Sequence, residues 1–244
     1  MSGSVRKSLL RDGRLKTVYE LLGETELVFD VGCDHGYLAA ELVLSGKTGR
    51  AVASDVSRAS VKKAAGLAER LGISGRMTVL EADGLSSAIN ADAPYRIAVS
   101  GMGGELIAKL VERNRKEAEK AELIVMQPMR GEAELRRYLF EKGFGIVDDR
   151  VVLDGGRFYQ IIAAKYGGEN SVPDGFPKGY YRFGWVAADR HPGELLPLLM
   201  HYRSVYLKEL EKAKAKGNNP EGILKEIELT DAVIRFAEET GKCC

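Results

Sequence analysis

The sequence has few cysteines, few histidines and almost no net charge. Two of its three cysteines are the adjacent Cys243 and Cys244, so they predict neither a disulfide framework nor a spaced metal site. The three histidines, His35, His191 and His201, lack metal-ligand spacing with one another or with cysteine, and we expect no metal. A formal charge of +1 excludes binding to nucleic acid through overall charge but leaves a local basic patch open.

Long apolar runs are also missing. No segment approaches the ~20 apolar residues that a membrane span requires, and residues 1–15 lack the apolar core of a signal peptide. We therefore expect a cytoplasmic protein with no membrane partner. At 244 residues, 45% of them hydrophobic, the chain is long enough for one sizeable core and a small appendage.

From residue 27 onward, short apolar runs alternate with longer amphipathic segments, which is typical of parallel strands joined by crossover helices. The strands expected from this pattern are 27–31, 49–54, 76–82, 96–100 and 123–126, and the helices are 37–45, 57–71, 105–113 and 132–142. We expect Ser57 to cap helix 57–71 and Gly72 to end it. Strands 146–153 and 158–165, joined by a glycine-rich turn, predict a closing antiparallel pair.

The composition changes at residues 167–179, where glycine, proline and asparagine favour a loop. Beyond it, apolar residues recur at helical spacing in 195–210 and 223–237, with a break at residues 217–220. Two helices of ~20 residues would each run ~30 Å. The sequence thus predicts one unit over residues 1–166 and, over 167–244, a linker with a helical hairpin.

The stretch over residues 30–36 has the form of a ligand loop: a strand that ends near an acidic residue, then a glycine-rich turn, then a helix. It lacks the middle glycine of the dinucleotide fingerprint and offers Asp34 instead, which disfavours a nicotinamide cofactor. A carboxylate from Asp30 or Asp34 would repel a pyrophosphate but attract the ammonium and sulfonium groups of S-adenosylmethionine. The loop therefore favours that cofactor.

Acidic residues also end the next two strands. Asp55 can accept two hydrogen bonds from ribose hydroxyls, and Asp83, followed by Gly84, can accept one from the adenine amino group. Each of them alone is equally typical of a turn or a helix cap. Because the carboxyl ends of parallel strands meet at one edge, the carboxylates together indicate one cofactor site.

The roles of four features around this edge remain open. His35 can cap a helix, bind a carboxylate or contact substrate, whereas Cys33 is expected to be a packing residue. The glycines of residues 101–104 admit a flat substrate or form a tight turn, and the Gln127 amide pairs with a base edge or caps neighbouring strands. Tyr37 and Tyr159 are stacking partners for a base or packing residues.

Basic residues gather near the start of the chain, with few acids among them: Arg6, Lys7, Arg11, Arg14 and Lys16. We expect them in a first helix, where they grip RNA phosphates or form a solvated face.

At these motifs the sequence resembles the bacterial TrmK family, tRNA methyltransferases that act on N1 of the adenine at tRNA position 22. The resemblance rests on Arg14-Leu15, residues 30–35, Ser54-Asp55, residues 83–85, residues 101–104, Gln127-Pro128 and residues 157–162. It extends over nearly the whole chain, and the predicted hairpin looks like the coiled-coil extension of that family. Ser100 and Met129 depart from the family pattern, which has alanine and asparagine there.

The resemblance implies a Rossmann-like α/β fold of the class I S-adenosylmethionine-dependent methyltransferases, with tRNA as partner and 1-methyladenosine as product. The expected cofactor-binding residues are Asp30, Gly32, Cys33, Asp34, His35, Gly36, Tyr37, Asp55, Val56, Asp83, Gly84, Gly101 and Met102. The expected catalytic residues are Asp34, His35 and Gln127. The expected substrate-binding residues are Arg6, Lys7, Arg11, Arg14, Gly103, Gly104 and Tyr159.

Two alternatives share the same loop. A methyltransferase that acts on another RNA or on a small molecule would keep the cofactor site, and for a small molecule it would need an enclosed apolar pocket. A non-catalytic adaptor that binds RNA and the cofactor is the second, because a fold alone does not establish activity.

Overall fold

The computed structural model describes residues 7–88, 90–169 and 171–241. Its centre is a seven-stranded sheet in the order β3-β2-β1-β4-β5-β7-β6. The strands are β1 (Thr25–Val31), β2 (Thr48–Asp55), β3 (Met77–Glu81), β4 (Tyr95–Met102), β5 (Leu123–Pro128), β6 (Phe144–Asp154) and β7 (Arg157–Tyr166). The first five run parallel, and β7 lies antiparallel to both β5 and β6. The predicted parallel strands with a closing antiparallel pair are confirmed.

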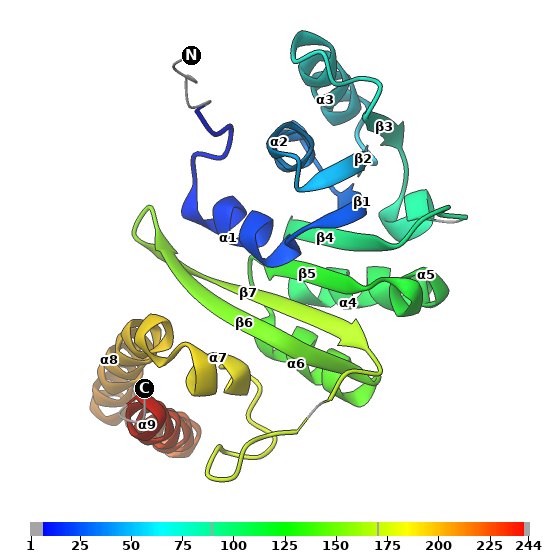
Figure 1. Ribbon diagram of the computed structural model, residues 1–244. Coiled ribbons are helices and arrows are strands. Elements are labelled where there is room, and N and C mark those ends of the chain that lie inside the picture. The colour runs from blue at the N-terminus through cyan, green and yellow to red at the C-terminus, as the bar shows by residue number, and fades with distance from the viewer. Residues whose placement is uncertain (1–6, 89, 170, 242–244) are drawn as a thin grey trace, which may run out of the picture.

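Helices cover both faces of the sheet (Figure 1). On one face lie α1 (Gly13–Leu22), α2 (Tyr37–Ser45) and α3 (Arg58–Arg70); on the other lie the 3-10 helix η1 (Gly84–Ala88), α4 (Gly104–Arg113), α5 (Arg115–Lys120) and α6 (Glu132–Glu141). Strand alternation explains this arrangement. In β1, Val28 belongs to the buried cluster under α1 and α2, while Phe29 belongs to the cluster on the opposite face.

The predicted helix ends of α3 are confirmed. The Ser57 side chain accepts a hydrogen bond from the Ser60 N–H, and Gly72 follows the helix with a φ of +66°. The expected position of the basic residues in the first helix needs correction. Helix α1 begins at Gly13 because the Asp12 side chain caps it by accepting from the Leu15 N–H at 2.7 Å. Lys7 and Arg11 therefore precede the helix, and Arg6 lies outside the described residues.

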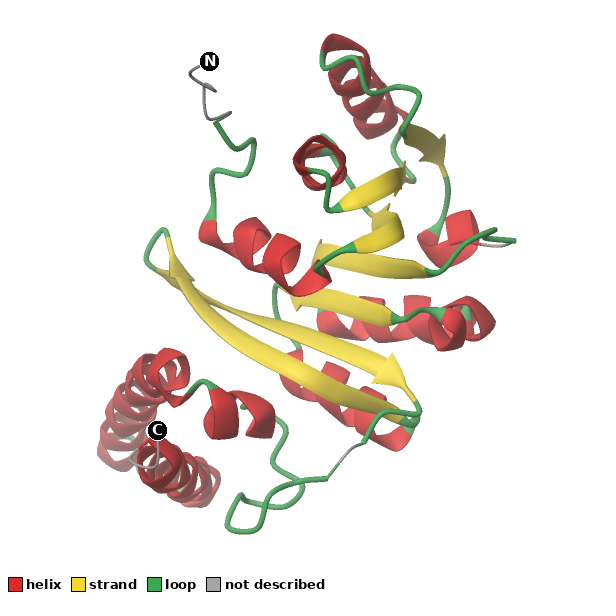
Figure 2. Ribbon diagram, viewed as in Figure 1, coloured by secondary structure: helices red, strands yellow, loops and turns green. Residues whose placement is uncertain are grey.

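The chain after β7 is a loop followed by helices only (Figure 2). These are α7 (Trp185–Arg190), α8 (Pro192–Ala215) and α9 (Glu221–Gly241). The sequence predicted the pair α8 and α9 but missed α5 and α7, since six residues are too few to show a helical period. The division into two units stays a prediction. Trp185, Leu195 and Val233 belong to the same buried cluster as Phe144 and Ile162 of the sheet.

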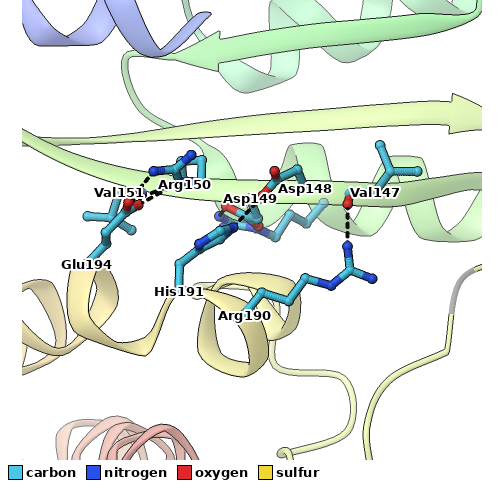
Figure 3. A network of polar contacts seen from close by, with 9 residues as sticks. Val147, Asp148, Asp149, Arg150, Val151, Arg190, His191 and Glu194 are labelled. Carbon is cyan, nitrogen blue, oxygen red and sulfur yellow. Dashed lines mark hydrogen bonds and ion pairs between the residues drawn. The ribbon is translucent and has the colours of Figure 1, made fainter. Parts of the chain in front are cut away.

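Charged residues fasten α8 to the outer strand β6. His191 and Glu194, at the start of α8, pair with Asp148 and Arg150, and Arg190 donates to the Val147 carbonyl (Figure 3). The α7–α9 helices, which we call the C-terminal extension, are thus held by polar contacts as well as by a shared core.

Candidate functional site

A cavity of about 580 Å³ opens at the carboxyl ends of β1, β4 and β5, beneath the start of α1. Its wall brings together Asp12 and Arg14 of α1's first turn, the loop after β1, Ser100 at the end of β4, and Tyr159 of β7. These segments are far apart in the sequence. Ligands of open α/β folds bind at this edge of the sheet.

Two glycines allow the loop after β1 to turn. Gly32 and Gly36 have φ values of +73° and +72°, which L side chains rarely adopt. A Cβ at Gly32 would lie 2.3 Å from Met102 Cε, and one at Gly36 would lie 3.0 Å from Ala64 Cβ. The loop is anchored to β2, because the Gly32 and Cys33 N–H groups both donate to the Ser54 carbonyl, at 2.8 and 3.0 Å.

Asp30 places a carboxylate in the wall of the cavity with one oxygen, Oδ2, that has no hydrogen-bond partner among the described residues. The side chain is buried. Burial, with a smaller contribution from the Asp55 charge, raises the pKa of Asp30 to about 7. A buried carboxylate of this kind is suited to a cationic ligand, which would offset the cost of ionising it.

Asp55 organises the loop as well as the end of β2. Its Oδ1 accepts from the Ser57 N–H at 2.8 Å and its Oδ2 accepts from the Asp34 N–H at 3.2 Å. Asp34 is held there with a φ of +46°, a left-handed conformation that non-glycine residues seldom adopt. Each Asp55 oxygen keeps a further lone pair for a ligand hydroxyl.

Six of the predicted cofactor residues do not line the cavity: Gly36, Met102 and, at the ends of β2 and β3, Asp55, Val56, Asp83 and Gly84. Val56 is exposed, and Asp83 forms an ion pair with Arg113 at 2.7 Å on the surface. Gly84 is buried at the start of η1, where a Cβ would lie 2.8 Å from Leu110 Cδ2. The structure thus brings Asp55 to the loop but leaves Asp83 engaged with an arginine.

Asp34, His35 and Tyr37 form a chain of contacts at the rim. His35 Nδ1 lies 2.7 Å from Asp34 Oδ2, and the His35 ring stacks on Tyr37 with 5.6 Å between ring centroids and 8° between planes. All three residues line the cavity. One face of the Tyr37 ring is therefore already stacked against His35.

Gln127 is fully buried at the end of β5, and its amide is engaged on both sides. Its Oε1 accepts from Arg14 Nη1 at 2.7 Å and from the Gly101 N–H at 3.1 Å, while its Nε2 donates to the Pro128 carbonyl at 2.6 Å. An irregularity in the β4–β5 register between Ser100 and Met102 frees the Gly101 N–H from the ladder. The contacts make Gln127 the anchor of Arg14.

Two guanidinium groups flank Tyr159. Arg14 and Arg157 lie 5.8 and 5.5 Å from its ring centroid, within the range of cation–π attraction. Arg157 Nη2 also donates to the Met129 carbonyl at 2.8 Å, which ties β7 to the end of β5. The sequence analysis did not single out Arg157, although it begins a segment that carries the family resemblance.

Gly103 and Gly104 lie in a separate hollow of about 380 Å³, next to Arg130 and Gly131. A Cβ at Gly104 would lie 2.0 Å from the Gly131 carbonyl oxygen. This glycine therefore lets the start of α4 approach the start of α6. The structure does not bring Gly103 and Gly104 into the main cavity.

Lys7 and Arg11 line a third hollow, of about 520 Å³, which shares Asp12, Leu15 and Tyr37 with the main cavity. The basic segment before α1 therefore adjoins the mouth of the cavity.

Cys33 lies in the cavity wall, where burial and the neighbouring carboxylates raise the pKa of its thiol. A thiol of this kind stays protonated and is a poor nucleophile. The described residues contain no group of three or more histidines, cysteines, aspartates or glutamates that would hold a metal ion. In the part of the chain that the structure describes, no helix is both long and apolar enough to span a membrane.

Comparison with known proteins identifies a family and two relatives. The model of a family described as "Methyltransferase domain" matches residues 11–162. The tRNA (adenine(22)-N(1))-methyltransferase of Bacillus subtilis (strain 168) is 28% identical over 162 residues, which is 66% of this chain and 68% of that protein. The crystal structure of the B. subtilis m1A22 tRNA methyltransferase TrmK superposes with a TM-score of 0.81 at 23% identity, over 93% of this chain and 99% of that one.

The second relative was solved with a ligand. Streptococcus pneumoniae Sp1610, described as a putative tRNA (m1A22) methyltransferase in complex with S-adenosyl-L-methionine, has a TM-score of 0.71 and 27% identity, and the match covers 95% of this chain and 99% of that one. The predicted Rossmann-like fold with C-terminal helices is confirmed.

Proposed function

Because the chain belongs to the methyltransferase-domain family, we propose that it transfers a methyl group from S-adenosylmethionine to N1 of an adenine in tRNA. By likeness to its B. subtilis relative, we take the target to be adenine 22. The observation that carries the proposal is the cavity itself, which joins an unpartnered Asp30 carboxylate oxygen to a rim of arginine and tyrosine. We also infer a cytoplasmic location, where tRNA is found.

The residues of the loop fit the cofactor. Asp30, with its unpartnered oxygen, would hold the ammonium group, and Asp55 would accept hydrogen bonds from the ribose hydroxyls. When bound, S-adenosylmethionine supplies an electrophilic methyl group on a positively charged sulfur. Asp34 adds a second carboxylate at the rim, and its charge favours a cationic ligand over a pyrophosphate.

The opposite side of the cavity would receive the base. N1 of adenine is a lone-pair nucleophile at neutral pH, so positioning is the main contribution required from the protein. Because N1 lies on the Watson–Crick edge, the base must be unpaired or extruded when it enters. We assign Tyr159 and Arg14 to this side, with Gln127 as a positioning residue that acts through Arg14.

Asp34 and His35 remain the candidates for proton transfer. His35 Nδ1 lies 2.7 Å from Asp34 Oδ2 at the rim of the cavity, between the side assigned to the cofactor and the side assigned to the base. Asn accepts the left-handed backbone of position 34 at least as well as Asp does, so Asp34→Asn removes the charge and keeps the loop. Normal turnover of this variant at saturating cofactor would show that Asp34 is not a catalytic residue.

The alternative function, a methyltransferase that acts on a small molecule, fits the cavity less well. Such an enzyme needs an enclosed apolar pocket, whereas charged side chains line this wall: Asp12, Arg14, Asp34 and Asp154. The cavity also adjoins the basic segment that carries Lys7 and Arg11. The charged wall disfavours an apolar small molecule, and the adjoining basic segment favours a large anionic substrate.

Cofactor binding should depend on pH through Asp30. Its pKa of about 7 in the folded protein lies above the ordinary 3.8, so the unliganded protein loses stability as the pH rises from 3.8 to about 7, where the carboxyl is ionised in the unfolded chain but protonated in the folded one. An ammonium ligand favours the ionised form. We therefore expect affinity for S-adenosylmethionine to increase roughly tenfold between pH 6 and pH 8, measured by calorimetry. Asp30→Asn should bind weakly with a flatter pH profile; an unchanged profile would contradict the assignment.

The tip of the C-terminal extension carries four exposed lysines that we assign to tRNA phosphates: Lys208, Lys212, Lys214 and Lys216. Changing all four to glutamine should weaken tRNA binding roughly tenfold at ~0.1 M salt and make the dependence on salt shallower. Filter binding over a salt series measures both quantities.

The matched control changes the exposed Lys62 and Lys63 of α3 to glutamine. If both variants lost the same affinity, the extension would have no specific part in binding. Point substitutions are preferable to deletion of the extension, because its apolar residues share a core with the sheet.

A further inference from the structure

The floor of the cavity is formed by the ends of three neighbouring strands. Asp30, Ser100 and Gln127 lie on β1, β4 and β5, and the register pairs Ser100 directly with Gln127. Each follows by two positions a buried residue of the cluster beneath α1 and α2, so the three side chains share one face of the sheet. The preceding core residues are Val28, Ala98 and Val125.

These three residues differ in how their polar atoms are satisfied. The amide of Gln127 is fully used by Arg14, Gly101 and Pro128. The hydroxyl oxygen of Ser100 is buried and has no hydrogen-bond partner among the described residues, although Ser100 lines the cavity. A buried hydroxyl without a partner costs about 1–3 kcal/mol. A bound ligand group would remove that cost.

The position of Ser100 indicates which ligand group its hydroxyl would contact. Asp30 pairs with Ala98 in the register, so Ser100 lies two residues closer to the open edge and on the side of β5. It therefore stands between the loop assigned to the cofactor and the wall formed by Arg14 and Met129. Ser100 and Met129 both line this cavity.

We propose that Ser100 contacts the substrate, with its Oγ accepting a hydrogen bond from the 6-amino group of the target adenine. This inference rests on the proposed function. In the reaction the N1 lone pair forms the bond to the methyl carbon as the methyl–sulfur bond breaks, and the electron pair of that bond stays on sulfur. The positive charge passes to the base and spreads over N1 and the 6-amino group. The amino group becomes a stronger donor, so the hydrogen bond to Ser100 strengthens in the transition state.

The test compares Ser100→Ala and Ser100→Thr with the unchanged protein on two tRNAs. One carries adenosine at the target position, and the other carries purine riboside, which lacks the 6-amino group. With adenosine, we expect kcat of Ser100→Ala to fall roughly tenfold, the threonine variant to restore most of it, and the Kd for S-adenosylmethionine to stay within about twofold. With purine riboside, the serine and alanine proteins should react at the same rate.

Ser87→Ala is the matched control, because the Ser87 hydroxyl is paired with Ser54 outside the cavity and its loss should leave both rates unchanged. A rate of Ser100→Ala within about twofold of the unchanged protein, or an equal loss on both tRNAs, would overturn the assignment of Ser100. A failure of the unchanged protein to form any 1-methyladenosine would instead overturn the proposed function, and with it the role of Ser100.

Discussion

Replacing Asp149 with alanine lowers the free energy of unfolding by about 3–5 kcal/mol, the largest effect on stability that we expect. Asp149 and Arg136 are both completely buried, and Arg136 Nε and Nη2 donate to the two Asp149 oxygens at 2.8 and 2.9 Å. The substitution leaves the guanidinium charge buried without its counter-ion. Urea unfolding followed by circular dichroism measures the change.

The effect should extend to the C-terminal extension. Arg136 also donates to the Tyr181 and Arg182 carbonyls, in the segment that leads into α7. Asp149 lies directly against Gly184, where a Cβ would be 1.9 Å from Asp149 Oδ2. We therefore expect Asp149→Ala to be cut faster by protease within residues 171–184.

Asp92→Ala is the control for Asp149. Asp92 pairs with Arg50 at 3.0 Å on the surface, where such pairs contribute about 0–1 kcal/mol. Equal losses in the two variants would show that the Arg136–Asp149 pair is no more important than a surface pair, contrary to our account.

Asp55→Ala is expected to have the largest effect on the cofactor. The variant loses the acceptor that fixes the Asp34 N–H and the carboxylate assigned to the ribose hydroxyls. Hydrogen bonds to a charged group contribute about 1.5–3 kcal/mol each, so affinity for S-adenosylmethionine should fall roughly a hundredfold. Isothermal titration calorimetry measures the affinity directly.

The matched control is Glu81→Gln. Glu81 pairs with Asp55 in the β2–β3 register and forms an ion pair with Arg58 at 2.9 Å on the surface, so it is an acidic strand end whose partner, unlike that of Asp55, is not in the loop after β1. Its variant should bind the cofactor within about twofold of the unchanged protein. Binding of Asp55→Ala within the same margin would remove Asp55 from the site.

The positions of the strands along the chain and the cofactor loop could be predicted because both are local patterns. Short apolar runs separated by helical spacing identify parallel strands, and glycines at 32 and 36 identify a turn that needs positive φ. The carboxyl ends of parallel strands share one edge, which is why Asp30 and Asp55 were expected together. Asp83 was grouped with them on the same argument, but its partner Arg113 could not be read from the spacing.

The side of the cavity assigned to the base could not be predicted from the sequence. Arg14 and Gln127 are 113 positions apart, and no period in the chain relates them. The sequence left the Gln127 amide open between a base edge and a cap of neighbouring strands, and the register irregularity at the end of β4 gives it Gly101 as a partner. An unpartnered hydroxyl such as that of Ser100 also depends on what does not approach it, which only the folded chain shows.

The Arg136–Asp149 pair illustrates the same limit in the core. Arg136 is on an amphipathic helix, where a charged residue is normally solvated. In β6, the register shifts between Ile146 and Asp148, and this bulge turns Asp149 towards the buried face. Simple alternation along the strand does not reveal such a shift.

The proposal that this chain methylates N1 of adenine in tRNA is tested most directly by one incubation. The protein is mixed with S-adenosylmethionine labelled in its methyl group and with bulk tRNA that lacks modifications, and the tRNA is then digested to nucleosides. Our account predicts that the label appears in 1-methyladenosine. Label in any other nucleoside would contradict it. Unlabelled tRNA would also contradict it, provided that the protein binds the cofactor.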